Sequence, residues 1–104
     1  MEIGLFQLEN LILTRTRFTF LDLRKNPVRH VSPELQAVLD QAVRVPADAA
    51  ATHLREGQIP PLTPVVLLCE DGQVSGQVAR GLESAGYQNV YVVVRGEAGL
   101  LTEL

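Results

Sequence analysis

The stretch that decides the fold covers residues 63–75: Thr63-Pro64-Val65-Val66-Leu67-Leu68-Cys69-Glu70-Asp71-Gly72-Gln73-Val74-Ser75. Residues 65–68 are a continuous apolar run behind a proline, which predicts a strand covered on both faces. A short polar loop follows, and from Val74 the apolar residues recur at steps of three and four, the period of a helix. We expect Ser75 to cap this helix and Gly86 to end it. The stretch therefore predicts a strand, a loop that begins with a cysteine, and a helix.

Cys69 is the only cysteine of the chain and stands at the carboxyl end of the predicted strand. A helix N-terminus presents unpaired N–H groups and a partial positive charge, so a loop that leads into it can form a cradle of backbone donors. A cysteine in such a cradle is stabilised as the thiolate, which is the nucleophilic form. We therefore expect Cys69 to be a nucleophile inside an anion-holding loop. The alternative, from residue type alone, is a buried core thiol.

Composition excludes several classes of protein. The 104 residues amount to one domain, residues 1–104, and 46% of them are hydrophobic, which is enough for a single core. The net charge is −3 and the basic residues are scattered, so we expect no binding of nucleic acid. No apolar run is long enough to cross a membrane, and residues 1–5 lack the basic start of a signal peptide. The sequence thus predicts a cytoplasmic protein with a free thiol and no membrane partner.

Strands and helices alternate along the rest of the chain. Strands are predicted at the N-terminus and at residues 18–24, 43–45 and 89–94, and helices at residues 6–13, 33–41, 47–56 and, as a terminal turn, 100–104. Ser32 and Pro33 supply the N-cap and first turn of the second helix. Such alternation is typical of a parallel α/β sheet, whose ligands bind outside the carboxyl ends of the strands. We therefore expect the strand ends that carry Asp22 and Arg24, Cys69, and Arg95 to lie along one edge.

Residues 21–24, Leu21-Asp22-Leu23-Arg24, place a carboxylate inside an apolar run. Burying a carboxylate is costly unless it is paired or hydrogen-bonded. We favour a structural pair between Asp22 and Arg24 that fixes the loop after this strand. The alternative is a direct role of these two side chains in catalysis.

Three motifs together resemble the rhodanese-like sulfurtransferases: Cys69-x-x-Gly72-x-x-Ser75, then Gly86-Tyr87-x-Asn89-Val90-Tyr91 after the helix, and Leu21-Asp22-Leu23-Arg24 at the end of an early strand. The resemblance implies an α/β fold of three layers, with a central parallel sheet of about five strands flanked by helices. The chain departs from the family pattern where Asp40-Gln41 replaces Pro-Gly and where Arg95-Gly96 replaces Gly-Gly.

The resemblance implies sulfur transfer in two half-reactions. Cys69 would take a sulfane sulfur from a small donor or a persulfidated protein, and would pass it to a thiol or to cyanide. The loop residues would hold the outer sulfur through backbone N–H groups: Glu70, Asp71, Gly72, Gln73, Val74 and Ser75. Asp22, Arg24 and Arg95 would support the loop. No organic cofactor is needed, and no metal is expected because neither His30 nor His53 has a second ligand at metal spacing.

The length and charge of the loop bear on the substrate. Six residues run from Cys69 to the residue before Ser75, as in sulfurtransferases, and a phosphatase would need arginine at position 75. Glu70 and Asp71 oppose a thiolate and repel a dianionic donor, with Arg24 and Arg95 as the candidates to offset them. We therefore predict weak activity with thiosulfate and a preference for a persulfide donor. Two alternatives remain, a catalytically idle module that binds a partner protein and a thiol redox sensor.

Overall fold

The computed structural model describes residues 1–14, 17–26 and 33–102. At its centre is a five-stranded sheet: β1 (Glu2–Ile3), β2 (Thr19–Asp22), β3 (Val43–Arg44), β4 (Val65–Leu68) and β5 (Val90–Val93). The strand order is β1-β5-β4-β2-β3, and every neighbouring pair is parallel. The predicted parallel sheet is therefore confirmed.

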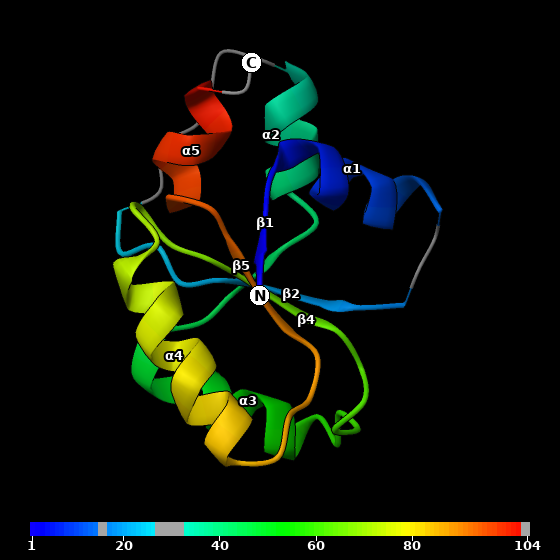
Figure 1. Cartoon of the computed structure of the whole chain (residues 1–104), viewed down its shortest axis with the longest axis vertical. Coiled ribbons are helices and arrows are strands. Elements are labelled where there is room, and N and C mark those ends of the chain that lie inside the picture. Colours follow the sequence, from blue (N-terminus) through cyan, green and yellow to red (C-terminus); the bar gives the residue numbers. More distant parts are fainter. Residues whose placement is uncertain (15–16, 27–32, 103–104) are drawn as a thin grey trace.

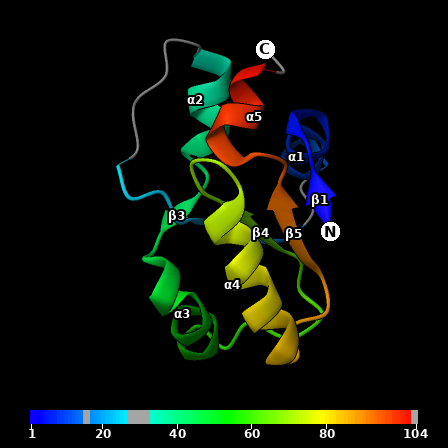
Figure 2. The same cartoon turned by 60° about the vertical axis from the view of Figure 1, so that its left-hand side comes forward.

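Helices cover both faces of this sheet (Figure 1 and Figure 2). One face carries α1 (Leu5–Leu13), α2 (Pro33–Leu39) and α5 (Gly96–Thr102), and the other carries the 3₁₀ turn η1 (Ala47–Ala49), α3 (Ala50–Glu56) and α4 (Gln73–Ser84). The side chains of β4 alternate between the two hydrophobic clusters, Val65 and Leu67 on the α3–α4 side and Val66 and Leu68 on the other. All four are fully buried, which explains the continuous apolar run of this strand. The predicted three layers are confirmed.

The register of the sheet brings the candidate residues to one edge. Asp22 at the end of β2 lies opposite Leu68 at the end of β4, and the next residue of β4 is Cys69. Val65 and Leu67 of β4 pair with Val90 and Val92 of β5. Because all the strands are parallel, the segments that follow β2, β4 and β5 emerge at the same edge.

The helix after the cysteine loop begins earlier than we predicted. Gly72, not Ser75, is the N-cap of α4, and Ser75 lies inside the first turn. Gly72 has a φ of 92°, a left-handed conformation that glycine adopts without strain and that turns the chain directly into the helix. At the other end Gly86, with a φ of 104°, follows the last helical turn as predicted. The expected cap Ser32 lies outside the described residues, as does His30.

The last helix also differs from the prediction. Residues 96–99, expected to end the preceding strand as a loop, form the first turn of α5. The backbone N–H groups of Glu97 and Ala98 donate to the carbonyl oxygens of Cys69 and Glu70, at 2.8 and 3.1 Å. These acceptors satisfy donors that a helix N-terminus otherwise leaves unpaired. A helix can therefore start here because of a tertiary contact that the local sequence does not reveal.

Candidate active site

Cys69 follows β4 directly, and its side chain is fully buried. Its Sγ accepts hydrogen bonds from the backbone N–H of Gly72 at 3.0 Å and of Ser75 at 3.4 Å. One donor is the N-cap of α4 and the other lies in its first turn, where the helix carries a partial positive charge. The structure thus places the sulfur inside the loop, against the helix N-terminus, as the sequence predicted.

The loop turns its carbonyl groups toward α5. The carbonyl groups of Cys69 and Glu70 are the ones that accept from α5. In a trans peptide the C=O and N–H bonds point in opposite directions, so the N–H groups of Glu70 and Asp71 point away from α5. Among the described residues these two N–H groups have no hydrogen-bond partner. The loop therefore has two unpaired backbone donors, Glu70 N–H and Asp71 N–H, in addition to the two N–H groups that donate to the sulfur.

Two glycines allow α5 and the loop to lie this close. A Cβ on Gly96 would lie 2.2 Å from the carbonyl oxygen of Cys69, and a Cβ on Gly72 would lie 3.2 Å from the Cα of Arg95. Gly96 also has a left-handed backbone, with a φ of 59°. The backbone of Arg95 thus packs against the N-cap of α4, while its side chain is exposed. This contact gives Arg95 a supporting position at the loop.

Asp22 and Arg24 form the buried pair that we favoured. Arg24 donates from Nε to Asp22 Oδ1 at 2.9 Å and from Nη2 to Oδ2 at 2.7 Å. Nη1 of Arg24 donates to the carboxylate of Glu97 in the first turn of α5. The hydrogen bonds to Asp22 raise the pKa of Arg24 above its ordinary value, against the opposing effect of burial, so the guanidinium stays charged.

This network corrects one expectation. Two carboxylates already neutralise Arg24, so its charge does not offset the acidic residues of the loop. Sequence reasoning missed Glu97 because the segment was expected to be a loop. The only signal in the sequence was the acidic side chain of Glu97, because acidic residues are favoured in the first turn of a helix.

The other loop side chains face different surroundings. Asp71 and Gln73 are exposed, and Asp71 Oδ1 accepts from the N–H of Gln73 at 3.0 Å. Glu70 Oε2 accepts from the backbone N–H of Lys25 at 2.8 Å, which ties the loop to the segment after β2. The hydroxyl of Ser75 is buried and has no hydrogen-bond partner among the described residues. Glu70 thus ties the start of the loop to the segment after β2, and the Ser75 hydroxyl at its other end has no hydrogen-bond partner among the described residues.

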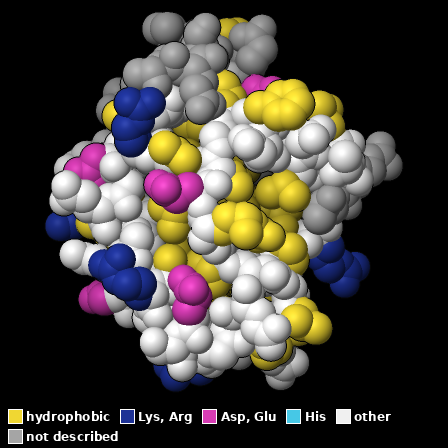
Figure 3. Space-filling model, viewed as in Figure 1, with side chains coloured by type: hydrophobic (Ala, Val, Ile, Leu, Met, Phe, Trp, Pro, Cys, Tyr) yellow, Lys and Arg dark blue, Asp and Glu magenta, His cyan; other side chains and the backbone are white. Residues whose placement is uncertain are grey.

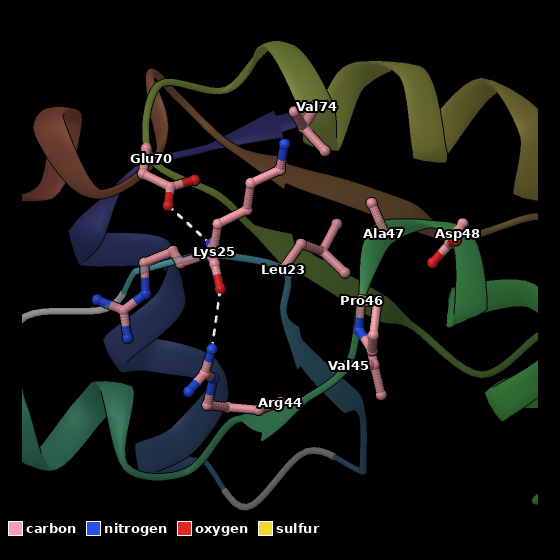
Figure 4. A pocket seen from close by; sticks show the side chains of 10 residues that line it. Leu23, Lys25, Arg44, Val45, Pro46, Ala47, Asp48, Glu70 and Val74 are labelled. Carbon is pink, nitrogen blue, oxygen red and sulfur yellow. Dashed lines mark hydrogen bonds between the residues drawn. The ribbon is translucent and has the colours of Figure 1, made fainter.

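A pocket of about 670 Å³ opens beside the loop (Figure 4). Its walls come from the loop, from the end of β2, and from β3 and η1. The apolar lining residues are Leu23, Val45, Pro46, Ala47 and Val74, and the charged ones are Arg24, Lys25, Arg44, Asp48 and Glu70. Cys69 is not part of the lining, and its side chain is fully buried. The sequence does not predict this pocket, because nothing in the local pattern of these segments indicates that they line a common space.

Within the ranges that the structure describes, no three His, Cys, Asp or Glu side chains are grouped so that they could hold a metal ion. In the same ranges no helix has the length and hydrophobicity that crossing a membrane requires.

Comparison with known proteins gives matches among solved structures alone. No protein-family model and no curated protein matches the chain. A rhodanese homolog from Thermus thermophilus shares 22% identity and a TM-score of 0.61, over 96% of this chain and 100% of that one. A thiosulfate sulfurtransferase from Pseudomonas aeruginosa shares 17% identity and a TM-score of 0.76, over 98% of this chain and 18% of that one.

A third match is the NAD-dependent persulfide reductase from A. fulgidus. It shares 25% identity and a TM-score of 0.63, over 93% of this chain and 15% of that one. The chain thus spans less than a fifth of the reductase and of the thiosulfate sulfurtransferase, but the whole of the Thermus homolog. These structures show that the chain has the rhodanese-like fold, as its motifs implied.

Proposed function

We propose that the chain is a sulfurtransferase, or persulfide carrier, with Cys69 as its nucleophile. The observation that carries this proposal is the position of Sγ, which accepts the N–H groups of Gly72 and Ser75 at the N-terminus of α4. Backbone donors and the helix dipole both favour a negatively charged sulfur. The N–H groups of Glu70 and Asp71, which have no hydrogen-bond partner among the described residues, are suited to a second sulfur bound to the first.

The reaction balances without an outside oxidant. The Cys69 thiolate attacks the outer sulfur of a persulfide donor R–S–SH, the S–S bond of the donor breaks, and R–S⁻ leaves with the electron pair. The product is Cys69–S–SH. In the second half-reaction an acceptor thiolate or cyanide attacks the outer sulfur, and Cys69 leaves as the thiolate. The names of two structural neighbours, a thiosulfate sulfurtransferase and a persulfide reductase, belong to the same sulfur chemistry.

The charges around the loop support a persulfide donor over thiosulfate. Glu70 and Asp71 are acidic neighbours of Cys69, and Asp22 and Glu97 neutralise Arg24. A dianionic donor therefore meets like charge without a free guanidinium from Arg24. We propose that thiosulfate is a poor donor for this protein.

The test is the intact mass of the protein after incubation with polysulfide, and separately with thiosulfate. We expect polysulfide to add one sulfur to the wild type and none to Cys69→Ser, and cyanide to remove it. The Cys69→Ser variant should retain the far-ultraviolet circular dichroism of the wild type, which shows that it is folded. A folded wild type that gains no sulfur from either donor would contradict the proposal.

Two observations favour a second candidate, a catalytically idle module that binds a partner protein. The Cys69 side chain is fully buried, so the loop must open before a donor can reach it. Hydrophobic side chains also gather across the middle of one face (Figure 3). The side chains of Met1 and Phe6, beside the edge strand β1, are 78% and 74% exposed. For this candidate we expect no added sulfur and a thiol that resists mild alkylation.

A further inference from the structure

The hydroxyl group of Ser75 differs from the other buried polar side chains. Among the described residues it is the one buried side-chain nitrogen or oxygen without a hydrogen-bond partner. The other two buried polar side chains, those of Asp22 and Arg24, bind each other. A buried hydroxyl without a partner has lost its hydrogen bonds to water and gained none from the protein, so it destabilises the fold.

Folding alone would favour alanine at position 75. The residue lies in the first turn of α4 and is fully buried. Alanine has a higher helix propensity than serine and would bury no polar atom. Serine hydroxyls inside helices often donate to the carbonyl oxygen of an earlier turn, and this one does not. A residue that breaks the local rules of stability is expected at a functional site.

The hydroxyl belongs to a residue whose backbone already binds the sulfur. Ser75 N–H donates to Cys69 Sγ at 3.4 Å, beside Gly72 N–H at 3.0 Å. In an α-helix each Cα–Cβ bond tilts toward the helix N-terminus, and the sulfur lies at that end of α4. Rotation about the Cα–Cβ bond moves Oγ between staggered positions without any change in the backbone. The hydroxyl is therefore well placed to join the donors around Sγ.

Sγ needs a further donor at one step of the proposed reaction. In Cys69–S–SH this inner sulfur is bonded to the outer sulfur and carries no charge. When an acceptor attacks the outer sulfur, the S–S bond breaks, its electron pair stays on Sγ, and Cys69 leaves as the thiolate. A donor to Sγ is therefore worth more in this transition state than in the persulfide, and such a difference accelerates the step.

We propose that the Ser75 hydroxyl is a catalytic donor, which donates a hydrogen bond to Cys69 Sγ as the S–S bond of the persulfide breaks. The inference rests on the persulfide chemistry proposed above and assigns a residue to its second half-reaction. Ser75 keeps its proton throughout. In the first half-reaction a donor makes the Cys69 thiolate more abundant but less nucleophilic, and these two effects oppose each other. The hydroxyl therefore acts mainly on the discharge of the sulfur.

The experiment measures loading and discharge separately in Ser75→Ala. Each protein is loaded with polysulfide and then mixed with cyanide, and both steps are followed by quenched intact mass. Loss of one donor to a developing oxyanion slows an enzyme by about 10²–10³-fold. Since sulfur is the weaker acceptor, we expect the rate constant of discharge to fall by about 10–30-fold and that of loading by less than about threefold.

Two further variants and a stability measurement separate catalysis from structure. Ser75→Thr keeps the hydroxyl and should discharge sulfur at nearly the wild-type rate. Ser84→Ala, which removes an exposed serine from the last turn of α4, should change neither step. The urea midpoint of Ser75→Ala should be no lower than that of the wild type, because the variant loses only an unpaired hydroxyl. If the added methyl group keeps Ser75→Thr from folding, the ratio of discharge to loading in Ser75→Ala decides by itself.

Loading and discharge also separate this inference from the proposed function. A Ser75→Ala variant that loads and discharges sulfur as fast as the wild type would overturn the inference and leave the proposed function standing. Equal slowing of both steps, with a lowered urea midpoint, would show a structural role and overturn it as well. A wild type that never loads sulfur would overturn the proposed function first, and the inference with it.

Discussion

Replacing Gly96 by alanine tests whether α5 holds the cysteine loop in place. A Cβ at this position would lie 2.2 Å from the carbonyl oxygen of Cys69 and 2.9 Å from the N atom of Asp71. Both neighbours are backbone atoms, so no side-chain rotation can make room. The first turn of α5 would have to withdraw from the loop.

The cost of Gly96→Ala can be worked from three losses. A left-handed backbone, here with a φ of 59°, costs a residue with a Cβ about 1 kcal/mol. Withdrawal of α5 also breaks the hydrogen bonds from Glu97 and Ala98 to the loop, each worth about 1 kcal/mol. We therefore expect Gly96→Ala to lower the free energy of unfolding by about 3 kcal/mol, a large share of the roughly 5–15 kcal/mol of a typical domain.

The assay is urea denaturation, with alkylation of Cys69 by iodoacetamide as a second measurement. The loop would lose the N–H groups of α5 that donate to its carbonyl oxygens. The thiol of the variant should therefore be alkylated faster than that of the wild type. Gly81→Ala is the matched control, because a Cβ there has no neighbour within 4 Å on the exposed side of α4. It should raise the free energy of unfolding by about 0.5–1 kcal/mol. A Gly96→Ala variant as stable as the wild type, with unchanged alkylation, would refute the docking of α5 on the loop.

Two further predictions concern the charged residues. Asp22→Asn should lower the free energy of unfolding by about 2–3 kcal/mol in urea denaturation, because it removes the charged acceptor of two Arg24 donors while Glu97 still pairs with the guanidinium. A loss below about 1 kcal/mol would contradict the buried network. Glu70→Gln keeps an oxygen acceptor for the N–H of Lys25 but removes a charge beside Cys69, so kcat/KM with thiosulfate should rise about fivefold at low salt. Glu83→Gln, an exposed change in the last turn of α4, should leave kcat/KM unchanged, and an equal rise in both variants would contradict a local effect of Glu70.

Local sequence patterns are enough to predict the sheet and the place of Cys69. The apolar run of residues 65–68 predicts a central strand because only a strand covered on both faces can bury every side chain. The positions of Cys69 after that strand and of Gly86 after the helix depend on neighbours along the chain. The pair of Asp22 and Arg24 could also be predicted, since its members are two residues apart. Each of these features depends on residues that are close in the sequence, so a local pattern is enough to predict it.

The surroundings of Cys69 become visible only in the folded structure. Glu97 meets Arg24 across 73 positions of sequence, and the contact depends on β2 and β5 ending at the same edge of the sheet. Tertiary contacts likewise allow a helix to begin at Gly96, because the carbonyl groups of the cysteine loop accept its first N–H groups. The pocket joins the segments after β2, β3 and β4, three strands that are neighbours in space but are separated in the chain. These contacts depend on which strands become neighbours in the sheet, and a local period of hydrophobicity predicts a strand but not its neighbours.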